Sequence, residues 1–307
     1  MKTNRRNLLH LGLGATIVPL TGCSALGAGK KGFIDAHVHV WTDDTDRWPI
    51  AEGFKKSDMQ PPRFNAEDLL AEAQPNGVDR IVLIQMSFYK TDNRYMLAAI
   101  RRRPNTFRGV AIIDPDSADP AAQMKALKEQ GVRGFRLYTD RAKAEAWLDS
   151  PSMRRMWTTG ADEGMAMCLL ANPDALPAVR RMCTEYPRTP VVIDHFARIG
   201  MKDDVNQADL DLLRALSDFE HIHVKTSAFY ALGKKQAPYT DLGPMIRQLR
   251  DSYGAKRLMW ATDCPYQVGD GHTYHDSIAL IRDRLDFLTP EDKDWMLRGT
   301  AERVFFG

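Results

Sequence analysis

The sequence predicts a single (β/α)8 barrel, in which eight parallel strands form a ring inside a shell of helices. Short apolar runs alternate with longer amphipathic runs eight times between residues 33 and 287, which is the pattern of repeated βα units. The 307 residues are 44% hydrophobic and 27% charged, a composition that supports one large core. No Gly-x-Gly-x-x-Gly follows the first strand, so the runner-up, a doubly wound open sheet, has less support.

Each expected strand is a short apolar run, and a stretch of helical length with apolar residues three or four apart follows it. The strands are expected at residues 33–40, 80–86, 107–113, 132–137, 165–170, 190–195, 221–226 and 257–262. The helices are expected at residues 65–74, 94–103, 121–130, 152–163, 174–186, 207–219, 239–253 and 275–287. Gly77, Gly131, Gly164 and Gly254 stand near helix ends, where a left-handed cap residue is favoured.

Two further segments flank or interrupt this repeat. Residues 291–306 are predicted to form a ninth helix that packs outside the barrel. Residues 41–62 form a long first βα loop that contains Trp41, Trp48 and Phe54. Because loops of this length are more often functional than idle, we expect this loop to line one wall of a pocket.

Residues 1–29 are predicted to be an export signal and linker, which leaves residues 30–307 for the barrel. Arg5 and Arg6 precede an apolar run that reaches Leu20, the layout of a twin-arginine signal. A Leu-Thr-Gly-Cys sequence ending at Cys23 resembles the cleavage box of bacterial lipoproteins. It predicts cleavage before Cys23 and a lipid anchor that holds the protein to a membrane on the periplasmic side. A plain signal peptide with an incidental cysteine is the alternative.

Cysteine usage and charge argue against two other classes of protein. Apart from Cys23, the cysteines are Cys168, Cys183 and Cys264, an odd number without zinc-finger or Cys-x-x-Cys spacing. We expect them to be reduced and buried, so a disulfide scaffold is not predicted. The formal net charge is only +2 and no basic block is present, so the sequence gives no support for a nucleic-acid partner.

Two histidines near the start of the barrel are the first indication of chemistry. His37 and His39 lie in the first expected strand, and residues i and i+2 of a strand point to the same side. Two adjacent imidazoles form half of a divalent-metal site, or a pair of hydrogen-bond donors for an oxyanion. From the spacing alone, it is equally plausible that the two histidines lie in a turn, make ordinary hydrogen bonds and have no chemical role.

The barrel prediction selects further candidates, because active sites of such barrels lie at the carboxyl ends of the strands. Arg136 ends the fourth expected strand and His195 ends the sixth. Asp263 directly follows the eighth strand, and Arg198 lies three residues after His195. These residues should therefore meet His37 and His39 at one rim of the barrel.

The same rule places the other histidines of the barrel. His221 and His223 begin the seventh strand, so we expect them at the opposite mouth, without a role in chemistry. His272 and His275 lie in the last βα loop, where they could contact substrate at the rim. A solvated surface position is the favoured alternative for both.

Five segments in this order resemble the amidohydrolase superfamily, and in particular its amidohydrolase-related group. The segments are Asp35-Ala36-His37-Val38-His39, residues 131–136 (Gly-Val-Arg-Gly-Phe-Arg), Asp194-His195 with Arg198, Val224-Lys225-Thr226-Ser227, and residues 259–265 (Met-Trp-Ala-Thr-Asp-Cys-Pro). The group includes 2-pyrone-4,6-dicarboxylate lactonase and sugar-acid lactonases, alongside metal-dependent decarboxylases. The resemblance spans residues 33–306. It implies a barrel hydrolase with a site made of His37, His39, His195 and Asp263.

The resemblance leaves the need for a metal open. Many members carry a bridging lysine at the end of the fourth strand, where this chain has Arg136, and zinc-dependent relatives carry a histidine on the fifth, which this chain lacks. A single zinc held by His37, His39 and Asp263, with His195 as a fourth ligand, would lower the pKa of a bound water to about 7. Without metal, Asp263 would act as general base while the three histidines donate to the lactone carbonyl oxygen.

Arg136 and Arg198 indicate the kind of substrate. A guanidinium at the end of an apolar strand is costly unless it meets an anion, and it matches a carboxylate in a two-pronged fork. We therefore expect a carboxylate on the substrate, with a salt bridge to Asp194 or Asp140 as the structural alternative. Further candidates for substrate contact are Tyr138, Lys225, Ser227, Tyr89 and Tyr230.

Taken together, the sequence predicts an exported hydrolase that opens a lactone of a small, carboxylate-bearing organic or sugar acid. A zinc-dependent, non-oxidative decarboxylase of an aromatic or enoic acid is the alternative among enzymes. From a different class, a surface-tethered barrel could bind such a ligand without turnover. The sequence specifies neither the individual substrate nor the oligomeric state.

Overall fold

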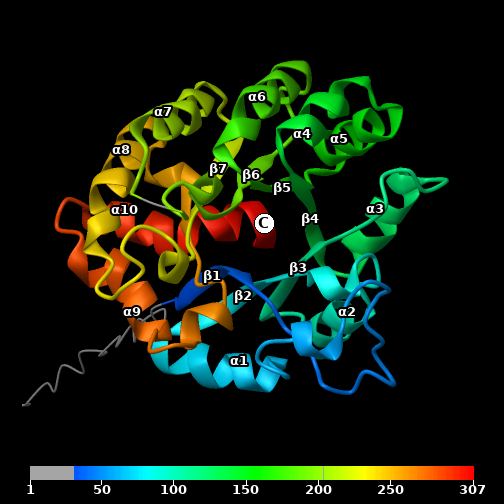
Figure 1. Cartoon of the computed structure of the whole chain (residues 1–307), viewed down its shortest axis with the longest axis horizontal. Helices are drawn as coiled ribbons and strands as arrows, with labels where there is room; N and C mark the ends of the chain where they lie inside the picture. Colours follow the sequence, from blue (N-terminus) through cyan, green and yellow to red (C-terminus); the bar gives the residue numbers. More distant parts are fainter. Residues whose placement is uncertain (1–30, 203) are drawn as a thin grey trace, which may run out of the picture. The chain divides into compact units, whose positions relative to one another are not determined.

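The structure, a computed structural model, describes residues 31–202 and 204–307, and residues 32–307 form one compact unit. Eight parallel strands follow one another in chain order, as expected. They are β1 Phe33–Val38, β2 Val78–Ile84, β3 Phe107–Ala111, β4 Val132–Thr139, β5 Ala166–Ala171, β6 Val191–Ile193, β7 Ile222–Thr226 and β8 Leu258–Trp260. The strands lie at the centre of the unit and the helices surround them (Figure 1).

The ring closes where the chain after β8 meets the end of β1. The backbone N–H of His39 donates to the carbonyl of Cys264 (2.8 Å), and that of Asp263 donates to the carbonyl of His37 (2.9 Å). Below this seam the buried carboxylate of Asp35 accepts from the backbone and the hydroxyl of Thr262 (3.0 and 2.5 Å). The seam therefore places Asp263 directly beside His37 and His39.

Ten α-helices are present in the described residues, and most of them bury an apolar stripe on their neighbours. They are α1 Ala66–Ala73, α2 Arg94–Arg102, α3 Pro120–Glu129, α4 Arg141–Ala146, α5 Pro151–Glu163, α6 Leu176–Glu185, α7 Gln207–Ala215, α8 Gly243–Tyr253, α9 Tyr274–Ala279 and α10 Pro290–Asp294. The short helix α4 was not among those expected from the sequence. Asp140 directly precedes it, and its side chain accepts from the backbone N–H of Lys143 (2.9 Å) and caps the helix.

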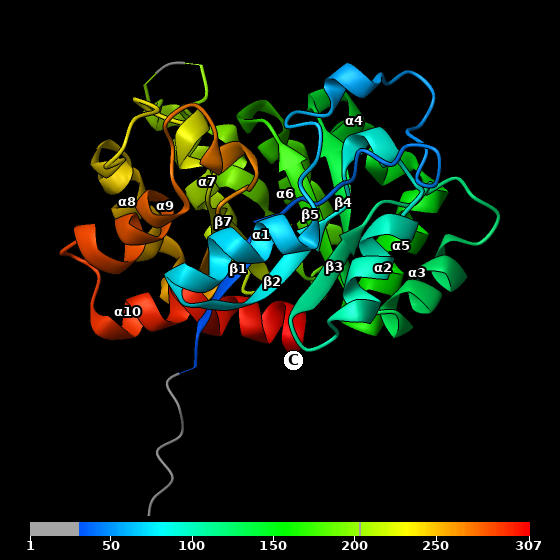
Figure 2. The same cartoon turned by 90° about the horizontal axis from the view of Figure 1, so that it is seen from below.

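The C-terminal helix corrects one expectation. It continues from α10 through Trp295–Gly299 to Glu302–Phe306 and runs beneath the strands, not along the outside of the barrel (Figure 2). Ala301 and Phe305 are buried in one cluster with inward-facing residues of several strands. The helix thus closes the amino-terminal mouth of the barrel. Its amphipathic pattern predicts an apolar contact, but not which apolar surface the helix covers.

The long loop at residues 41–62 borders a cavity, but not the one at the carboxyl ends of the strands. Trp41 pairs with Phe64 in an antiparallel bridge, and its ring packs at 5.5 Å on that of Phe88. No residue of this loop lines the cavity at the carboxyl ends of the strands. The start of the loop instead faces α2, where Thr42 to Trp48 border a separate cavity of about 250 Å³. The loop therefore contributes to the shell of the barrel and not to the wall of the candidate site.

Three observations concern the predictions on export and cysteines. Cys168, Cys183 and Cys264 are buried and unpaired, as expected. No helix in residues 31–202 and 204–307 combines the length and apolarity that a membrane span requires. Residues 1–30, including Cys23 and the predicted signal, lie outside the described residues.

Candidate active site

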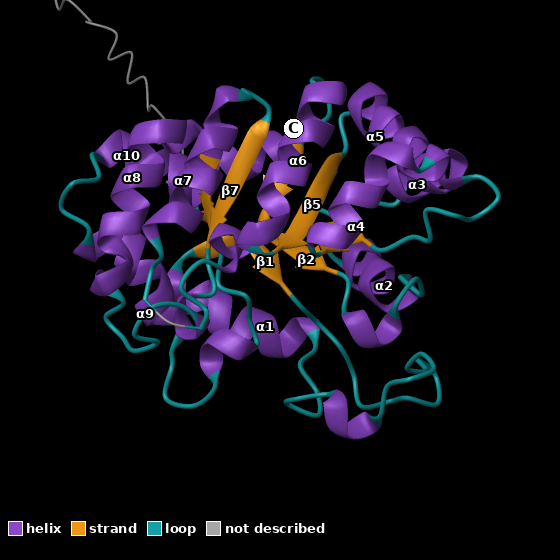
Figure 3. Ribbon diagram, turned by 45° about the horizontal axis from the view of Figure 1, so that its top comes forward, coloured by secondary structure: helices purple, strands orange, loops and turns teal. Residues whose placement is uncertain are grey.

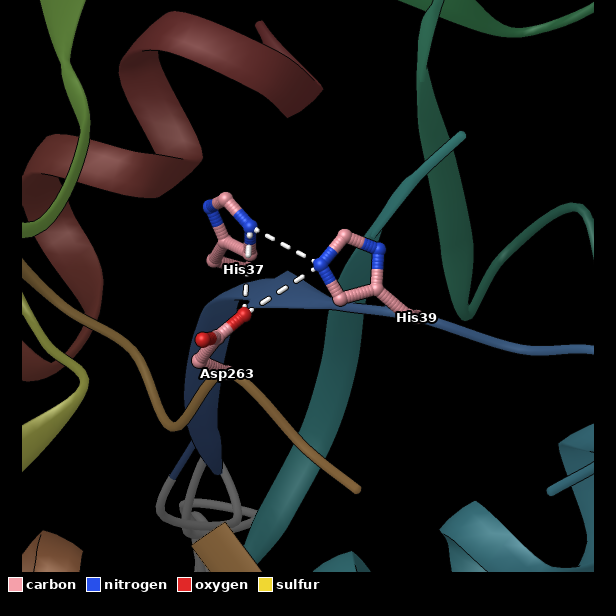
Figure 4. Close-up of side chains that lie close together, drawn as sticks. All are labelled: His37, His39 and Asp263. Carbon is pink, nitrogen blue, oxygen red and sulfur yellow. Dashed lines mark hydrogen bonds and ion pairs between the residues drawn. The ribbon is translucent and has the colours of Figure 1, made fainter. Parts of the chain in front are cut away.

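The carboxyl ends of the strands bring His37, His39 and Asp263 together at the centre of the barrel. The Nε2 atoms of the two histidines are 3.3 Å apart, and they lie 3.4 and 3.2 Å from Oδ1 of Asp263 (Figure 4). His195, which follows β6, brings its Nε2 to 3.8 Å from the same oxygen. All four side chains are buried. The four residues expected at one rim are therefore one cluster.

A cavity of about 240 Å³ opens above this cluster, on the side of the barrel where the loops gather in Figure 3. It is lined by His39, Met86, Ser87, Arg136, Tyr138, Leu170, His195, Arg198, Met201, Ala228, Tyr230, Ala231, Leu232, Asp263 and Tyr266. His37 is not among them, because it lies one layer deeper and is fully buried. No role was predicted for Tyr266, although its position three residues after Asp263 in the last βα loop could have indicated one.

Unusual backbone conformations position three of these side chains, those of Asp263, His195 and Arg198. Asp263 has a φ of 70°, and His195, Phe196, Ala197 and Arg198 have φ values from 51° to 61°. Such left-handed conformations cost residues with a Cβ of the order of 1 kcal/mol or more, and they concentrate at functional sites. The local sequence contains no glycine to signal this turn.

Hydrogen bonds hold the rings of His39 and His195 in place, and the one made by His39 shows which of its nitrogens carries a hydrogen. Nδ1 of His39 lies 2.9 Å from the carbonyl oxygen of Ile84. A carbonyl can only accept, so Nδ1 of His39 carries a hydrogen, and Nε2 faces the guanidinium of Arg136 (3.5 Å), which can only donate, so Nε2 presents a lone pair. His195 is held through Nδ1, which lies 2.8 Å from the hydroxyl of Ser227.

The two carboxylate oxygens of Asp263 have different environments. Oδ2 accepts a hydrogen bond from the hydroxyl of Tyr230 (2.7 Å). Oδ1 is buried and has no hydrogen-bond partner in the described residues. Although burial opposes ionisation, the imidazole of His195 holds the pKa of Asp263 below its ordinary value. Asp263 is thus a carboxylate with one oxygen tied and one available.

Lys225 occupies a different place from the substrate-contacting one expected for it. It is fully buried beneath His37 and does not line the cavity. Its Nζ lies 3.0 Å from Oδ1 of Asp194 and 3.2 Å from Nδ1 of His37. Burial opposes ionisation of Asp194, but the ammonium of Lys225 holds the pKa of this carboxyl well below its ordinary value. Because β7 points this side chain inward at a lower level than the strand ends, Lys225 supports the cluster from below.

Arg136 and Arg198 both line the cavity, and neither forms an ion pair within residues 31–202 and 204–307. Nη1 of Arg136 lies 3.5 Å from Nε2 of His39, and its guanidinium stacks 4.8 Å above the ring of Tyr138. Arg198 donates to the side-chain oxygen of Asn172 (3.2 Å). The alternative partners Asp194 and Asp140 meet lysines instead. Both arginines therefore remain free to bind an anion in the cavity.

The other histidines lie away from the cavity. His223 is 3.4 Å from Arg303 of the C-terminal helix, at the amino-terminal mouth where we expected it. His272 contacts the hydroxyl of Tyr239 (2.7 Å), and His275 is exposed. Tyr89 is buried in the core, so it is also removed from the site.

The spacing of the cluster, considered alone, is that of a zinc site. Bonds of about 2.0 to 2.1 Å in a tetrahedral shell separate ligand atoms by about 3.3 to 3.4 Å, close to the three distances observed here. A ligand must also direct a lone pair at the metal, and His39 and Asp263 do so. His37 does not, because the ammonium of Lys225 can only donate to Nδ1 and leaves the hydrogen of the ring on Nε2. The three residues therefore have the spacing of a metal site, but the hydrogen on Nε2 of His37 prevents this atom from acting as a ligand.

Comparison with known proteins identifies the family. The family model described as Amidohydrolase matches residues 34–307, and the chain belongs to this family. The chain is 30% identical to 4-sulfomuconolactone hydrolase of Rhizobium radiobacter over 77% of its length and 76% of the relative. It is 28% identical to L-fucono-1,5-lactonase of Burkholderia ambifaria over 87% and 93%. A solved structure from Pseudomonas putida, provisionally named a 2-pyrone-4,6-dicarboxylic acid hydrolase, superimposes with a TM-score of 0.75 at 25% identity, covering 90% and 98%.

Proposed function

We propose that the protein is a lactonase that hydrolyses a cyclic ester carrying a carboxylate. The observation that carries this proposal is Oδ1 of Asp263, a buried carboxylate oxygen without a hydrogen-bond partner in the described residues. It lies beside a cavity that two guanidiniums without ion pairs also line. The relatives named as lactone hydrolases support the same reaction.

In the proposed mechanism, Asp263 acts as the base. A water molecule in the cavity attacks the lactone carbonyl, and Oδ1 of Asp263 accepts one of its protons. As the ring C–O bond of the tetrahedral intermediate breaks, the same proton passes from Asp263 to the leaving oxygen. The products are a free carboxylic acid and a hydroxyl on one open chain. An ester is activated enough for this modest assistance, whereas an amide would need more.

His195 is proposed to bind the carbonyl oxygen. The hydroxyl of Ser227 lies 2.8 Å from Nδ1 of His195, the shorter of its two contacts, and donates to it in this proposal. Nε2 then carries the hydrogen and donates to the developing oxyanion. Of the three histidines expected to donate to the carbonyl oxygen, only His195 is proposed to do so. His39 has its N–H on Ile84, and His37 lies below the cavity.

Arg136 and Arg198 are proposed to hold the substrate carboxylate. A carboxylate meets a guanidinium through two parallel hydrogen bonds, which fixes orientation as well as affinity. A cavity of about 240 Å³ suits a small molecule. The rings of Tyr138, Tyr230 and Tyr266 supply flat, mostly apolar walls for the remainder of the substrate.

Two alternatives were open from the sequence, a zinc-dependent decarboxylase and a barrel that binds its ligand without turnover. A zinc-dependent decarboxylase needs His37 as a ligand, and the contact of this ring with Lys225 argues against that role. A barrel that only binds its ligand would not need a general base. Oδ1 of Asp263 has no hydrogen-bond partner in the described residues and could act as such a base. Capture of a carboxylated lactone without ring opening would be the signature of that alternative.

The test is a panel of small lactones with and without a carboxylate, incubated with the enzyme after exhaustive chelation and after addition of zinc. Acid release is followed with a pH indicator. We expect turnover of carboxylated lactones, both pyrone-type and sugar-acid, at rates that chelation leaves unchanged. Matched lactones without a carboxylate should be poor substrates. Absence of turnover across the panel, or decarboxylation of an aromatic acid that requires zinc, would reject the proposal.

We also propose export and lipid anchoring at Cys23, which rests on the sequence of residues 1–29 alone. Labelled palmitate should be incorporated into the wild-type protein in a bacterial host and not into Cys23→Ser. Replacement of Arg5 and Arg6 by lysine should block export through the twin-arginine route. Label in the Cys23→Ser protein, or a soluble unlabelled wild type, would contradict the anchor.

A further inference from the structure

A buried triad made of Lys225, Asp194 and His37 lies below the cavity. All three side chains are completely inaccessible to solvent. The ammonium of Lys225 lies 3.0 Å from Oδ1 of Asp194 and 3.2 Å from Nδ1 of His37. Nδ1 of His37 and Oδ1 of Asp194 are slightly farther apart, at 3.4 Å. The nearest partner of the histidine is therefore a cation.

The chemistry of an ammonium decides where the hydrogen of His37 lies. Lysine offers three N–H donors and no acceptor, so a contact with Nδ1 is favourable only when Nδ1 presents its lone pair. The ammonium of Lys225 is nearer to Nδ1 of His37 than the carboxylate of Asp194 is, so Nδ1 turns its lone pair toward the cation. A neutral ring with a bare Nδ1 carries its single hydrogen on Nε2.

The remaining hydrogen bonds of the cluster agree with this assignment. Nδ1 of His39 donates to Ile84, and Nη1 of Arg136, which can only donate, lies 3.5 Å from Nε2, so Nε2 of His39 is an acceptor. Nε2 of His37 lies 3.3 Å from that acceptor and can donate to it. With the opposite tautomer of His37, two lone pairs would face each other at Nε2, and two N–H groups would face each other at Nδ1. One tautomer satisfies both ends of the ring.

We propose that Lys225 is a positioning residue that fixes the Nε2–H tautomer of His37 and thereby excludes a tightly bound divalent metal from the lactonase site. The assignment rests on the proposed function only for its consequence, a hydrolase that works without metal. The three potential ligand atoms have the spacing of a zinc shell. In this proposal the buried ammonium of Lys225 is what prevents zinc from binding there.

The substitution that tests this is Lys225→Met, which keeps the length of the side chain and removes its donors. Asp194, released from the ammonium, can then accept from Nδ1–H of His37, and Nε2 turns its lone pair to the cluster. This is the carboxylate–histidine–metal arrangement that raises metal affinity. We expect the affinity for Zn²⁺ to rise by about 100-fold over wild type, with one ion per chain. Co²⁺ should give the visible spectrum of a tetrahedral site in the variant only.

Three further variants make the result interpretable. Lys128→Met, at a surface lysine paired with Glu163, should bind zinc as wild type does. The double variant His37→Gln with Lys225→Met should lose the gained affinity, because the third ligand is gone. If Lys225→Met does not fold with Asp194 left unpaired, Lys225→Met with Asp194→Asn removes both charges, and asparagine still accepts from Nδ1–H. The same gain is expected of that pair.

A second measurement needs neither metal nor activity. Nitrogen-15 spectra of the histidine rings in the purified wild-type protein distinguish the two tautomers. We expect the Nε2–H form for His37 and the Nδ1–H form for His39, which serves as the internal reference. An Nδ1–H form for His37, sub-micromolar stoichiometric zinc in wild type, or equal zinc affinity in wild type and Lys225→Met would overturn the proposal. A lactone panel without turnover would reject the proposed function but leave these readouts intact.

Discussion

His195 and Arg198 stand at the two ends of one left-handed turn, and both side chains line the cavity. The turn has close to three residues per revolution, so residues i and i+3 point the same way. Phe196 and Ala197 between them point away and are fully buried. The turn therefore carries the donor for the carbonyl and a guanidinium for the carboxylate as one rigid unit.

Ala197 tests the geometry of this turn. Glycine at this position would relieve the left-handed strain of about 1 kcal/mol but lose a buried methyl group worth about 0.8 kcal/mol. We expect the free energy of unfolding of Ala197→Gly to lie within about 1 kcal/mol of wild type. Ala197→Val should lose about 2 kcal/mol or more, because a β-branched residue is strained there and overpacks its surroundings. Urea unfolding measures both, and equal stability of the two variants would argue against the turn.

Arg136→Met and Arg198→Met test recognition of the carboxylate. Loss of a charge-assisted hydrogen bond of about 1.5 to 3 kcal/mol should lower kcat/KM for a carboxylated lactone by about 10- to 100-fold. The rate with a lactone that lacks the carboxylate should change little. Arg141→Met is the matched control, since Arg141 is exposed and paired with Glu145 on α4. Equal losses with both substrates would mean that the arginines do not select the carboxylate.

Tyr230→Phe tests the different environments of the two oxygens of Asp263. Burial, and next the carboxylate of Asp263, raise the pKa of Tyr230, so its hydroxyl stays a donor. Its removal should lower kcat by about 10-fold or more while KM stays nearly constant, because the substrate contacts remain. Tyr266→Phe changes a hydroxyl in the same cavity without touching Asp263 and should retain activity. If both variants behave alike, the bond from Tyr230 has no catalytic consequence.

His223 gives a prediction about stability that is independent of the active site. Burial, and next the charge of Arg303, lower the pKa of His223 from 6.5 to about 4. The unfolded chain then binds a proton more readily than the folded one. Stability present above pH 6.5 is therefore lost as the pH falls toward 4, by about 3 kcal/mol in full.

Urea unfolding at pH 7.5 and pH 4.5 isolates this contribution when wild type is compared with His223→Gln. The variant should lose less stability on acidification than wild type does. His275→Gln, at an exposed histidine, should follow wild type. An unchanged pH dependence in His223→Gln would show that this histidine is not responsible.

The alternation of apolar runs was sufficient to predict the barrel, because each βα unit is a local pattern and the order of parallel neighbours follows the chain. The rule that sites lie at the carboxyl ends of strands correctly grouped His37, His39, His195 and Asp263. It also placed His223 at the opposite mouth. These successes depend on which end of a strand a residue occupies, which the sequence states directly.

Other features depend on depth or on distant contacts, which the sequence does not state. Lys225 points into the barrel, but its depth on β7, which places it under His37 and not in the cavity, is visible only in the structure. The apolar stripe ending at Phe305 fits the outside of a barrel as well as its lower mouth. The turn at Phe196 and Ala197 contains no glycine, so its left-handed backbone conformation could not be predicted from the residue types.

The most direct test of the central claim is steady-state hydrolysis of a carboxylated lactone by metal-free wild type and by Asp263→Asn, with thermal unfolding to confirm that both are folded. Asparagine keeps the shape of the side chain but cannot accept the proton from water. We predict a fall in kcat of about 10²- to 10⁴-fold with little change in substrate affinity. A kcat for Asp263→Asn within about threefold of wild type would remove Asp263 from the reaction and contradict the mechanism.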